Sequence, residues 1–217
     1  MTGKAALLRL MTLMSPSFPV GGFSYSHGLE QAVADGLVTD FASLENWLSS
    51  LVAHGSLWND AVLFAESFRR SDDISDVITL GEALAGSKER YLESQAQGAA
   101  FIAAARAGGY ASAQSLPAKA PYSVAAGRIA AEQGIALEDG LAAFIHAFAG
   151  NQVQAAIRLS LFGQAEGVRM IAALEPLILA TANRAAHSTL DDLGGSAMMA
   201  EIAAMRHEAL YSRIFRT

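Results

Sequence analysis

The sequence predicts an all-α fold, a single-domain bundle of roughly eight to ten closely packed helices that spans residues 1–217. Apolar residues recur at steps of three and four along most of the chain, and runs of alternating β-branched residues are too short for strands. Alanine is abundant, and small side chains let helix axes approach closely. A chain of 217 residues, 52% of them hydrophobic, is long enough to bury a substantial core.

The first four expected helices have clear apolar faces. The first face consists of Leu7, Leu10, Met11 and Met14, and the helix ends before Pro16 and Pro19 because proline cannot donate a backbone hydrogen bond. A short helix follows over residues 26–35, and Gly36 suits the left-handed position after its end. The next two faces are formed by Phe41, Leu44, Trp47, Leu48 and Leu51, and by Trp58, Val62, Phe64, Ala65 and Phe68.

Six further helices are expected in the rest of the chain. They cover residues 74–84, 88–107, 123–133, 137–161, 166–186 and 196–215. The stretch ARAGGYASAQSLPAKAPYS is the most loop-like segment of the sequence. Pro176 is expected to kink or split the helix that contains it.

The composition excludes several classes of function. The formal net charge is −6, whereas proteins that bind nucleic acid broadly carry a basic face. There are no cysteines, so disulfides, thiolate metal sites and cysteine nucleophiles are excluded. Arg9, Arg106 and Glu175 interrupt the apolar runs before they reach the ~18 residues of a membrane span. We therefore expect a cytoplasmic protein without nucleic-acid or membrane partners.

One acidic string is the strongest signature of an enzyme. Asp72, Asp73 and Asp76 have the DDxxD spacing with which helical diphosphate enzymes hold magnesium. Such enzymes need a second acidic cluster, and Asp191 and Asp192 are followed by glycines instead of a third carboxylate. Acidic residues at a helix start also cap its free N–H groups, which is the favoured interpretation. A small all-α magnesium-dependent diphosphate enzyme stays the alternative.

Other signatures of catalysis are missing from the sequence. The five histidines lie too far apart to form a local metal motif. No phosphate-binding loop and no nucleophile elbow are present. We therefore predict no catalytic residue and no metal ligand.

The stretch PVGGFSYSHGLE, residues 19–30, is far more polar and turn-prone than the chain around it. We predict a structural turn there, because adjacent glycines allow backbone conformations that other residues resist. Its residues are Pro19, Gly21, Gly22 and Phe23. In one interpretation its aromatic residues anchor an interface. In the other, they fill the core while Ser24 or Ser26 caps the next helix and Glu30 reaches back to that helix start.

The C-terminal segment MRHEALYSRIFRT gathers basic residues in a protein that is acidic elsewhere. Tyr211 and Phe215 lie four positions apart, so a helix would place them on one face. Such a segment is either a solvated helix end, favoured by the helix dipole, or a docking segment for a partner. We predict docking by residues 206–217.

Four motifs together resemble the UreF family of urease accessory proteins. PVGGFSYSHGLE is similar to the family hallmark, and KERYLESQAQGAAF is similar to a segment with an ExxxQG core. NQVQAAIRLSLFGQAEG and MRHEALYSRIFRT resemble two later family segments. The motifs occur in the same order over essentially the whole chain, which makes the resemblance specific.

The resemblance implies an all-α, non-catalytic assembly factor that forms a homodimer. In the family, such a factor binds UreD (also called UreH) on apo-urease and recruits the GTPase UreG, which delivers nickel. The implied role is a chaperone for nickel insertion into urease. No cofactor is expected in this chain, because nickel and GTP are handled by partner proteins.

The resemblance and the two unusual segments together predict two binding faces. The UreG face is expected to contain Tyr25, His27, Glu30, Arg158 and Gln164, with Arg158 and Gln164 alternatively at the subunit interface. We expect Tyr25 and Glu30 to be exposed contacts that Phe23 supports. The UreD face is expected to contain Arg206, His207, Tyr211, Arg213, Phe215 and Arg216, with the two aromatic residues as anchors.

Overall fold

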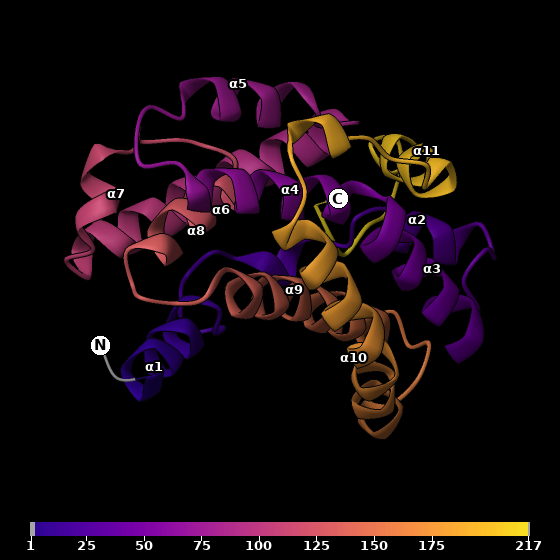
Figure 1. Ribbon diagram of the computed structural model, residues 1–217. Coiled ribbons are helices and arrows are strands. Elements are labelled where there is room, and N and C mark those ends of the chain that lie inside the picture. Colours follow the sequence, from indigo (N-terminus) through magenta and orange to yellow (C-terminus); the bar gives the residue numbers. More distant parts are fainter. Residues whose placement is uncertain (1–2, 217) are drawn as a thin grey trace.

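The computed structural model describes residues 3–216, which fold into helices without a strand among them (Figure 1). This confirms the all-α prediction. The helices are α1 (Gly3–Leu13), α2 (Leu29–Ala34), α3 (Phe41–His54), α4 (Ser56–Arg69), α5 (Ser75–Ala83), α6 (Lys88–Ala107), α7 (Ala111–Ser115), α8 (Tyr122–Ala131), α9 (Leu137–Arg158), α10 (Gln164–Ala186) and α11 (Met198–His207). Two short 3₁₀ helices, η1 (Gly22–Ser24) and η2 (Leu190–Asp192), complete the set.

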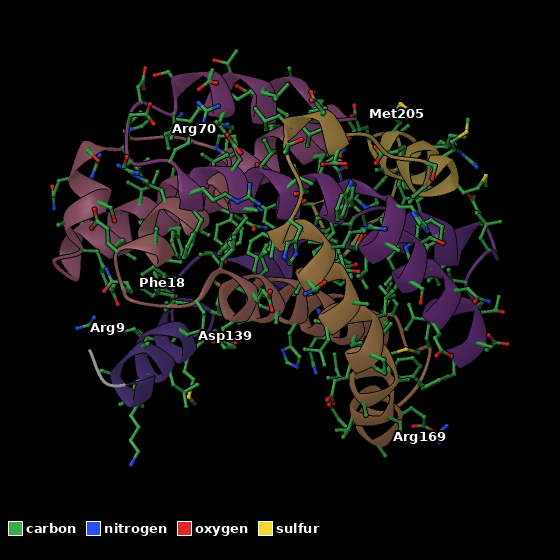
Figure 2. All side chains as sticks on the ribbon, viewed as in Figure 1. Arg9, Phe18, Arg70, Asp139, Arg169 and Met205 are labelled. Atoms are coloured by element: carbon green, nitrogen blue, oxygen red, sulfur yellow. The ribbon has the colours of Figure 1, made fainter. Side chains whose placement is uncertain are left out.

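Helix α4 lies at the centre of the bundle and packs against α3, α5, α8, α9 and α10 (Figure 1). Its buried face includes Phe64, whose ring lies 5.2 Å from that of Phe144 in α9. The segment after α1 joins the same core through Phe18, which packs on Phe101 of α6 with ring centroids 4.7 Å apart (Phe18 is labelled in Figure 2). Among the described residues, no helix combines the length and apolar character needed to cross a membrane.

Two glycines allow neighbouring segments to approach α4 and α6 closely. A Cβ on Gly127 of α8 would lie 2.3 Å from the carbonyl oxygen of Phe64. A Cβ on Gly98 of α6 would lie 1.8 Å from the carbonyl oxygen of Ala120. Both contacts are with backbone atoms, which cannot move aside as a side chain can. Only glycine fits these positions without displacing the backbone that faces it.

Replacing Gly98 with alanine should therefore destabilise the protein, by about 1–3 kcal/mol if the core responds as over-packed cores do. The matched control is Gly150→Ala in α9, where no atom lies within 4 Å of the added Cβ. That variant should be unchanged or slightly more stable, because alanine is the better helix former. Urea unfolding followed by circular dichroism measures both variants, and equal stabilities would contradict this account of the packing.

Three details of the predicted elements differ in the structure. Helix α10 is not split at Pro176: it runs as one helix through the proline, with Leu174 and Ile178 buried on either side. The segment expected to be a loop contains α7, and Arg106 holds the end of α7 through bonds to the carbonyls of Ala113 and Leu116 at 3.0 and 2.6 Å.

The third difference is at the C-terminus, where a helix over residues 196–215 was expected. Helix α11 covers only Met198–His207. Residues 208–216, which we call the tail, continue without regular helix and return beside α2 (Figure 1). The backbone N–H groups of Ile214 and Phe215 donate to a side chain of α2 instead of to helix carbonyls, and this replaces the last helical turns.

Candidate partner-binding site

The turn of residues 19–30 has the backbone geometry that its glycines suggest. Gly21 has a φ of 72° and precedes η1, and Gly28 has a φ of 77° and precedes α2. A Cβ on Gly28 would lie 2.8 Å from the backbone nitrogen of Ala204, so this glycine also lets α11 approach the turn.

Glu30 connects the turn to the tail. Its side chain is buried, and its Oε1 accepts a hydrogen bond from the N–H of Ile214 at 2.7 Å. Its Oε2 accepts from the N–H of Phe215 at 2.9 Å and lies 3.0 Å from Nε2 of His207. The N–H of Glu30 donates to Oγ of Ser26 at 3.3 Å, so the serine satisfies a backbone donor at the start of α2.

A second carboxylate holds the other side of the same cluster. Oε2 of Glu89, in the first turn of α6, lies 2.7 Å from Nδ1 of the fully buried His207. Arg213 of the tail forms an ion pair with Oε1 of Glu89. The N–H of Arg216 donates to the carbonyl oxygen of Ser24 at 2.9 Å. The tail is therefore attached to α2, α6 and the turn mainly by polar contacts.

One aromatic residue anchors the tail in the core. Phe215 is 3% exposed, and the guanidinium of Arg158 lies over its ring, 4.3 Å from the centroid. The same guanidinium donates to the carbonyl oxygen of Phe23. Arg158, from the end of α9, thus connects the tail to the turn.

Four residues of the two predicted faces lie in one contiguous cluster. Arg158 and Glu30, assigned to one face, contact Phe215 and His207, assigned to the other. Arg206 lies outside the cluster, and its exposed side chain forms a bidentate ion pair with Asp35 at 2.7 and 3.2 Å. In the described part of the chain, the exposed Gln164 forms no hydrogen bond or ion pair with this cluster.

Several predicted exposures are wrong. Tyr25 and Glu30 are buried, whereas Phe23, expected to support them, is 68% exposed. The reason is that the returning tail covers Glu30, which no pattern within the turn indicates. Tyr211 and Phe215 do not share a helical face, because the tail is not helical: Tyr211 is fully exposed and Phe215 is buried.

His27 is also buried, and it belongs to a polar network beneath the turn. Its Nε2 lies 2.8 Å from Oε1 of Glu93, which also accepts from the amide of Gln97 at 2.8 Å. Arg90 lies 3.5 Å from the other oxygen of Glu93 and forms an ion pair with Asp60 of α4. Burial alone would raise the pKa of Glu93, but His27 and Arg90 hold that pKa below its ordinary value.

Glu93, Gln97 and Gly98 are the three named positions of the ExxxQG pattern in α6, and each has a structural role. Glu93 binds His27, Gln97 donates to Glu93, and Gly98 admits the backbone before α8. The motif is visible in the sequence, but the residues that its side chains and backbone contact are not. A cavity of about 610 Å³ lies between this network and the turn, with Pro19, Gly22 and Phe23 among its lining residues.

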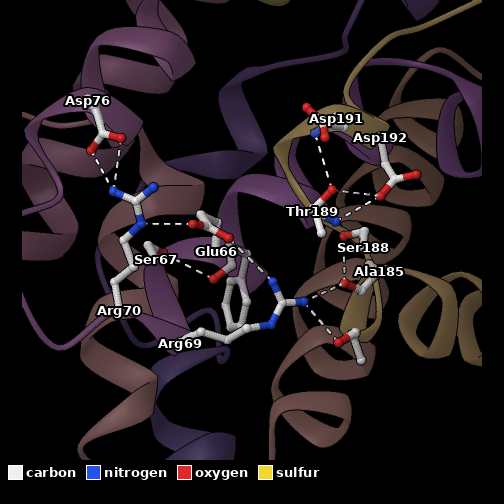
Figure 3. A network of polar contacts seen from close by, with 12 residues as sticks. Glu66, Ser67, Arg69, Arg70, Asp76, Ala185, Ser188, Thr189, Asp191 and Asp192 are labelled. Carbon is white, nitrogen blue, oxygen red and sulfur yellow. Dashed lines mark hydrogen bonds and ion pairs between the residues drawn. The ribbon is translucent and has the colours of Figure 1, made fainter.

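The acidic string in front of α5 has a structural role. Oδ1 of Asp73 accepts from the N–H of Ser75 at 3.0 Å and from its hydroxyl at 2.6 Å, and these bonds lower the pKa of Asp73. Both carboxylate oxygens of Asp76 accept from Nη1 of Arg70, at 2.8 and 2.9 Å, which lowers the pKa of Asp76 (Figure 3). Asp73 therefore accepts from the first N–H of α5, although the N-cap position itself is Ile74, whose side chain forms no capping bond. In residues 3–216, no group of three acidic or histidine side chains is arranged to hold a metal ion.

Comparison with known proteins identifies the family. The UreF family model matches residues 38–175. The urease accessory protein UreF of Mesorhizobium japonicum is 57% identical over 98% of this chain and 96% of its own. The UreF of Agrobacterium fabrum is 54% identical over 100% of this chain and 98% of its own, and that of Rhizobium etli is 51% identical over 98% and 96%. The chain, with its turn and tail joined through Glu30, belongs to the UreF family of urease accessory proteins.

Proposed function

We propose that this protein bridges UreD-bound apo-urease and the GTPase UreG, and thereby enables nickel insertion into the urease active site. Membership of the UreF family supports a role in urease maturation. The turn and the tail, with Glu30, Glu89, Arg158 and His207 that join them, form one site that we call the seat. The observation that carries the proposal is that Glu30 accepts hydrogen bonds from two tail N–H groups within this seat. A partner that binds the tail therefore also contacts the surface next to the turn.

In this proposal, the exposed side chains of the seat make the contacts and its buried side chains hold them in place. Tyr211, Ile214 and Arg216 are exposed on the tail and face UreD. Phe23, exposed on the turn, and Arg158 face UreG. Aromatic and arginine side chains are the residues that most often dominate binding energy at interfaces.

The protein acts without chemistry of its own in this proposal. It works in the cytoplasm as a homodimer, and no nucleic acid or membrane takes part. Nickel and GTP are held by the partner proteins, and this chain contributes neither a catalytic residue nor a resident metal site. A pulldown of purified chain with UreD and UreG, followed by a urease activation assay at limiting nickel, tests the proposal. Active urease from cells that lack the protein would contradict it.

Replacing Tyr211 with alanine should weaken binding to UreD by about 2 kcal/mol, or about thirtyfold, as expected for an interface hot spot. The stability of the isolated protein should not change, because this side chain is fully exposed. Tyr91→Ala is the matched control, since Tyr91 is a tyrosine of α6 that is 40% exposed and outside the seat. Surface plasmon resonance with immobilised UreD measures both variants, and equal affinities would show that Tyr211 is not a contact.

A further inference from the structure

We propose that His207 is a positioning residue whose ring carries a proton on both nitrogens and so fixes Glu30 for the tail. This inference rests on the proposed function at one point, which is the role of the tail in binding a partner protein. His207 is fully buried, so it cannot touch a partner protein while the tail is seated. Its effect on docking must act through the groups that it contacts.

The first argument is the number of hydrogen-bond donors. Nδ1 of His207 lies 2.7 Å from a carboxylate oxygen of Glu89, and Nε2 lies 3.0 Å from one of Glu30. An ionised carboxylate only accepts hydrogen bonds, and a neutral imidazole donates from one nitrogen alone. With a neutral ring, the lone pair of the other nitrogen would face a carboxylate oxygen. Both contacts are satisfied together when both nitrogens carry a proton.

The second argument is the balance of charge. The charged groups that face His207 are Glu30 from α2, Glu89 from α6 and, through Glu89, Arg213 from the tail. On α11, Arg206 is engaged with Asp35, and at the start of the tail Glu208 accepts from the N–H of Lys88 at 2.9 Å. Two carboxylates and one guanidinium leave one negative charge in a buried site. A doubly protonated ring neutralises it, and buried charges persist when they are paired in this way.

The third argument is the geometry at Glu30. Its Oε2 is shared between His207 and the N–H of Phe215, and its Oε1 accepts from the N–H of Ile214. The imidazolium thus fixes the orientation in which the carboxylate meets two successive tail amides. With one proton fewer, a lone pair would face either Glu30 or Glu89, and the two carboxylates that hold the tail would no longer both be fixed.

Two measurements on the isolated protein test the proposal. Side-chain ¹⁵N NMR of histidine-labelled protein at neutral pH should show both nitrogens of His207 protonated. A nitroxide on Ser212→Cys reports the mobility of the tail, since Ser212 is exposed and the chain has no other cysteine. The nitroxide should be immobile wherever the NMR signals show both nitrogens of His207 protonated, and mobile wherever they show one nitrogen unprotonated.

Variants separate a positioning role from a merely structural one. In His207→Gln, whose amide cannot donate to two opposed carboxylates, the nitroxide should be mobile at every pH. The control is His187→Gln, where the exposed ring forms a hydrogen bond with the carbonyl of Asn183 in its own helix turn, and this variant should follow the wild type. If His207→Gln does not fold, Glu89→Gln takes its place in the NMR experiment. Removal of one carboxylate should leave His207 with a single protonated nitrogen.

A neutral His207 at neutral pH with the tail still immobile would overturn the proposal. So would a tail whose mobility does not change with the number of protonated nitrogens on His207. Neither measurement involves UreD or UreG. A protein in which the NMR and nitroxide results hold but UreD does not bind would therefore contradict the proposed function and leave this inference standing.

Discussion

Replacing Glu30 with alanine should release the tail. The variant loses two hydrogen bonds from tail amides to a charged acceptor, and such bonds contribute about 1.5–3 kcal/mol each. We therefore expect hydrogen exchange at Ile214 and Phe215 to accelerate by at least about a hundredfold, which corresponds to about 3 kcal/mol. Copurification with UreD should be lost at the same time, although α2 and the bundle remain folded.

Asp35→Ala is the control for this experiment. It removes the exposed ion pair between Asp35 and Arg206, which also joins α2 to α11. Exposed pairs contribute about 0–1 kcal/mol, so exchange at the two tail amides should change less than tenfold. Unchanged exchange in Glu30→Ala, or equal acceleration in the two variants, would contradict the role given to Glu30.

Replacing Glu93 with glutamine should destabilise the whole bundle. Glu93 is 1% exposed and pairs with His27 and Arg90, and removal of one partner from a buried ion pair costs about 3–5 kcal/mol. For a chain of this length, that cost lowers the melting temperature by roughly 6–20 °C. Differential scanning calorimetry measures the change.

The exposed Asp72 supplies the control, because Asp72→Asn alters a carboxylate that is exposed to solvent. A surface substitution of this kind changes the free energy of unfolding by about 0.5 kcal/mol or less. A melting temperature of Glu93→Gln equal to that of Asp72→Asn would show that the network beneath the turn is not important for stability.

The wild type should also depend on pH through Glu93. The pKa of Glu93 is lowered in the folded protein. At an acidic pH its side chain therefore binds fewer protons in the folded state than in the unfolded state. The resulting stability is present above the ordinary pKa of glutamate and is lost as the pH falls through the lowered value. In Glu93→Gln this part of the acid dependence should disappear, and its persistence would assign the dependence to other groups.

Local patterns predicted the parts of the fold that depend on local contacts. The helix faces follow from apolar spacing, and the left-handed Gly36, with a φ of 72°, follows from the end of α2. The turn at Gly21 follows from the glycine itself. Each of these features is decided by residues within a few positions of one another.

The seat of the tail could not be predicted in this way. Glu30 is separated from Ile214 and Phe215 by 184 and 185 positions, and no periodicity connects residues that far apart. The four-residue spacing of Tyr211 and Phe215 suggested a helix, but Glu30 binds the backbone that such a helix would use. The burial of Tyr25 and Glu30 was missed for the same reason, because the covering segment comes from the other end of the chain.

The central claim is that the turn and the tail form one binding site on which both partners depend. Deletion of residues 208–217 tests it most directly, with complex formation followed by size-exclusion chromatography and light scattering. The account predicts that the shortened chain keeps its helical circular dichroism and loses both UreD and UreG from the complex. A shortened chain that still recruits UreD and UreG as the full chain does would contradict it.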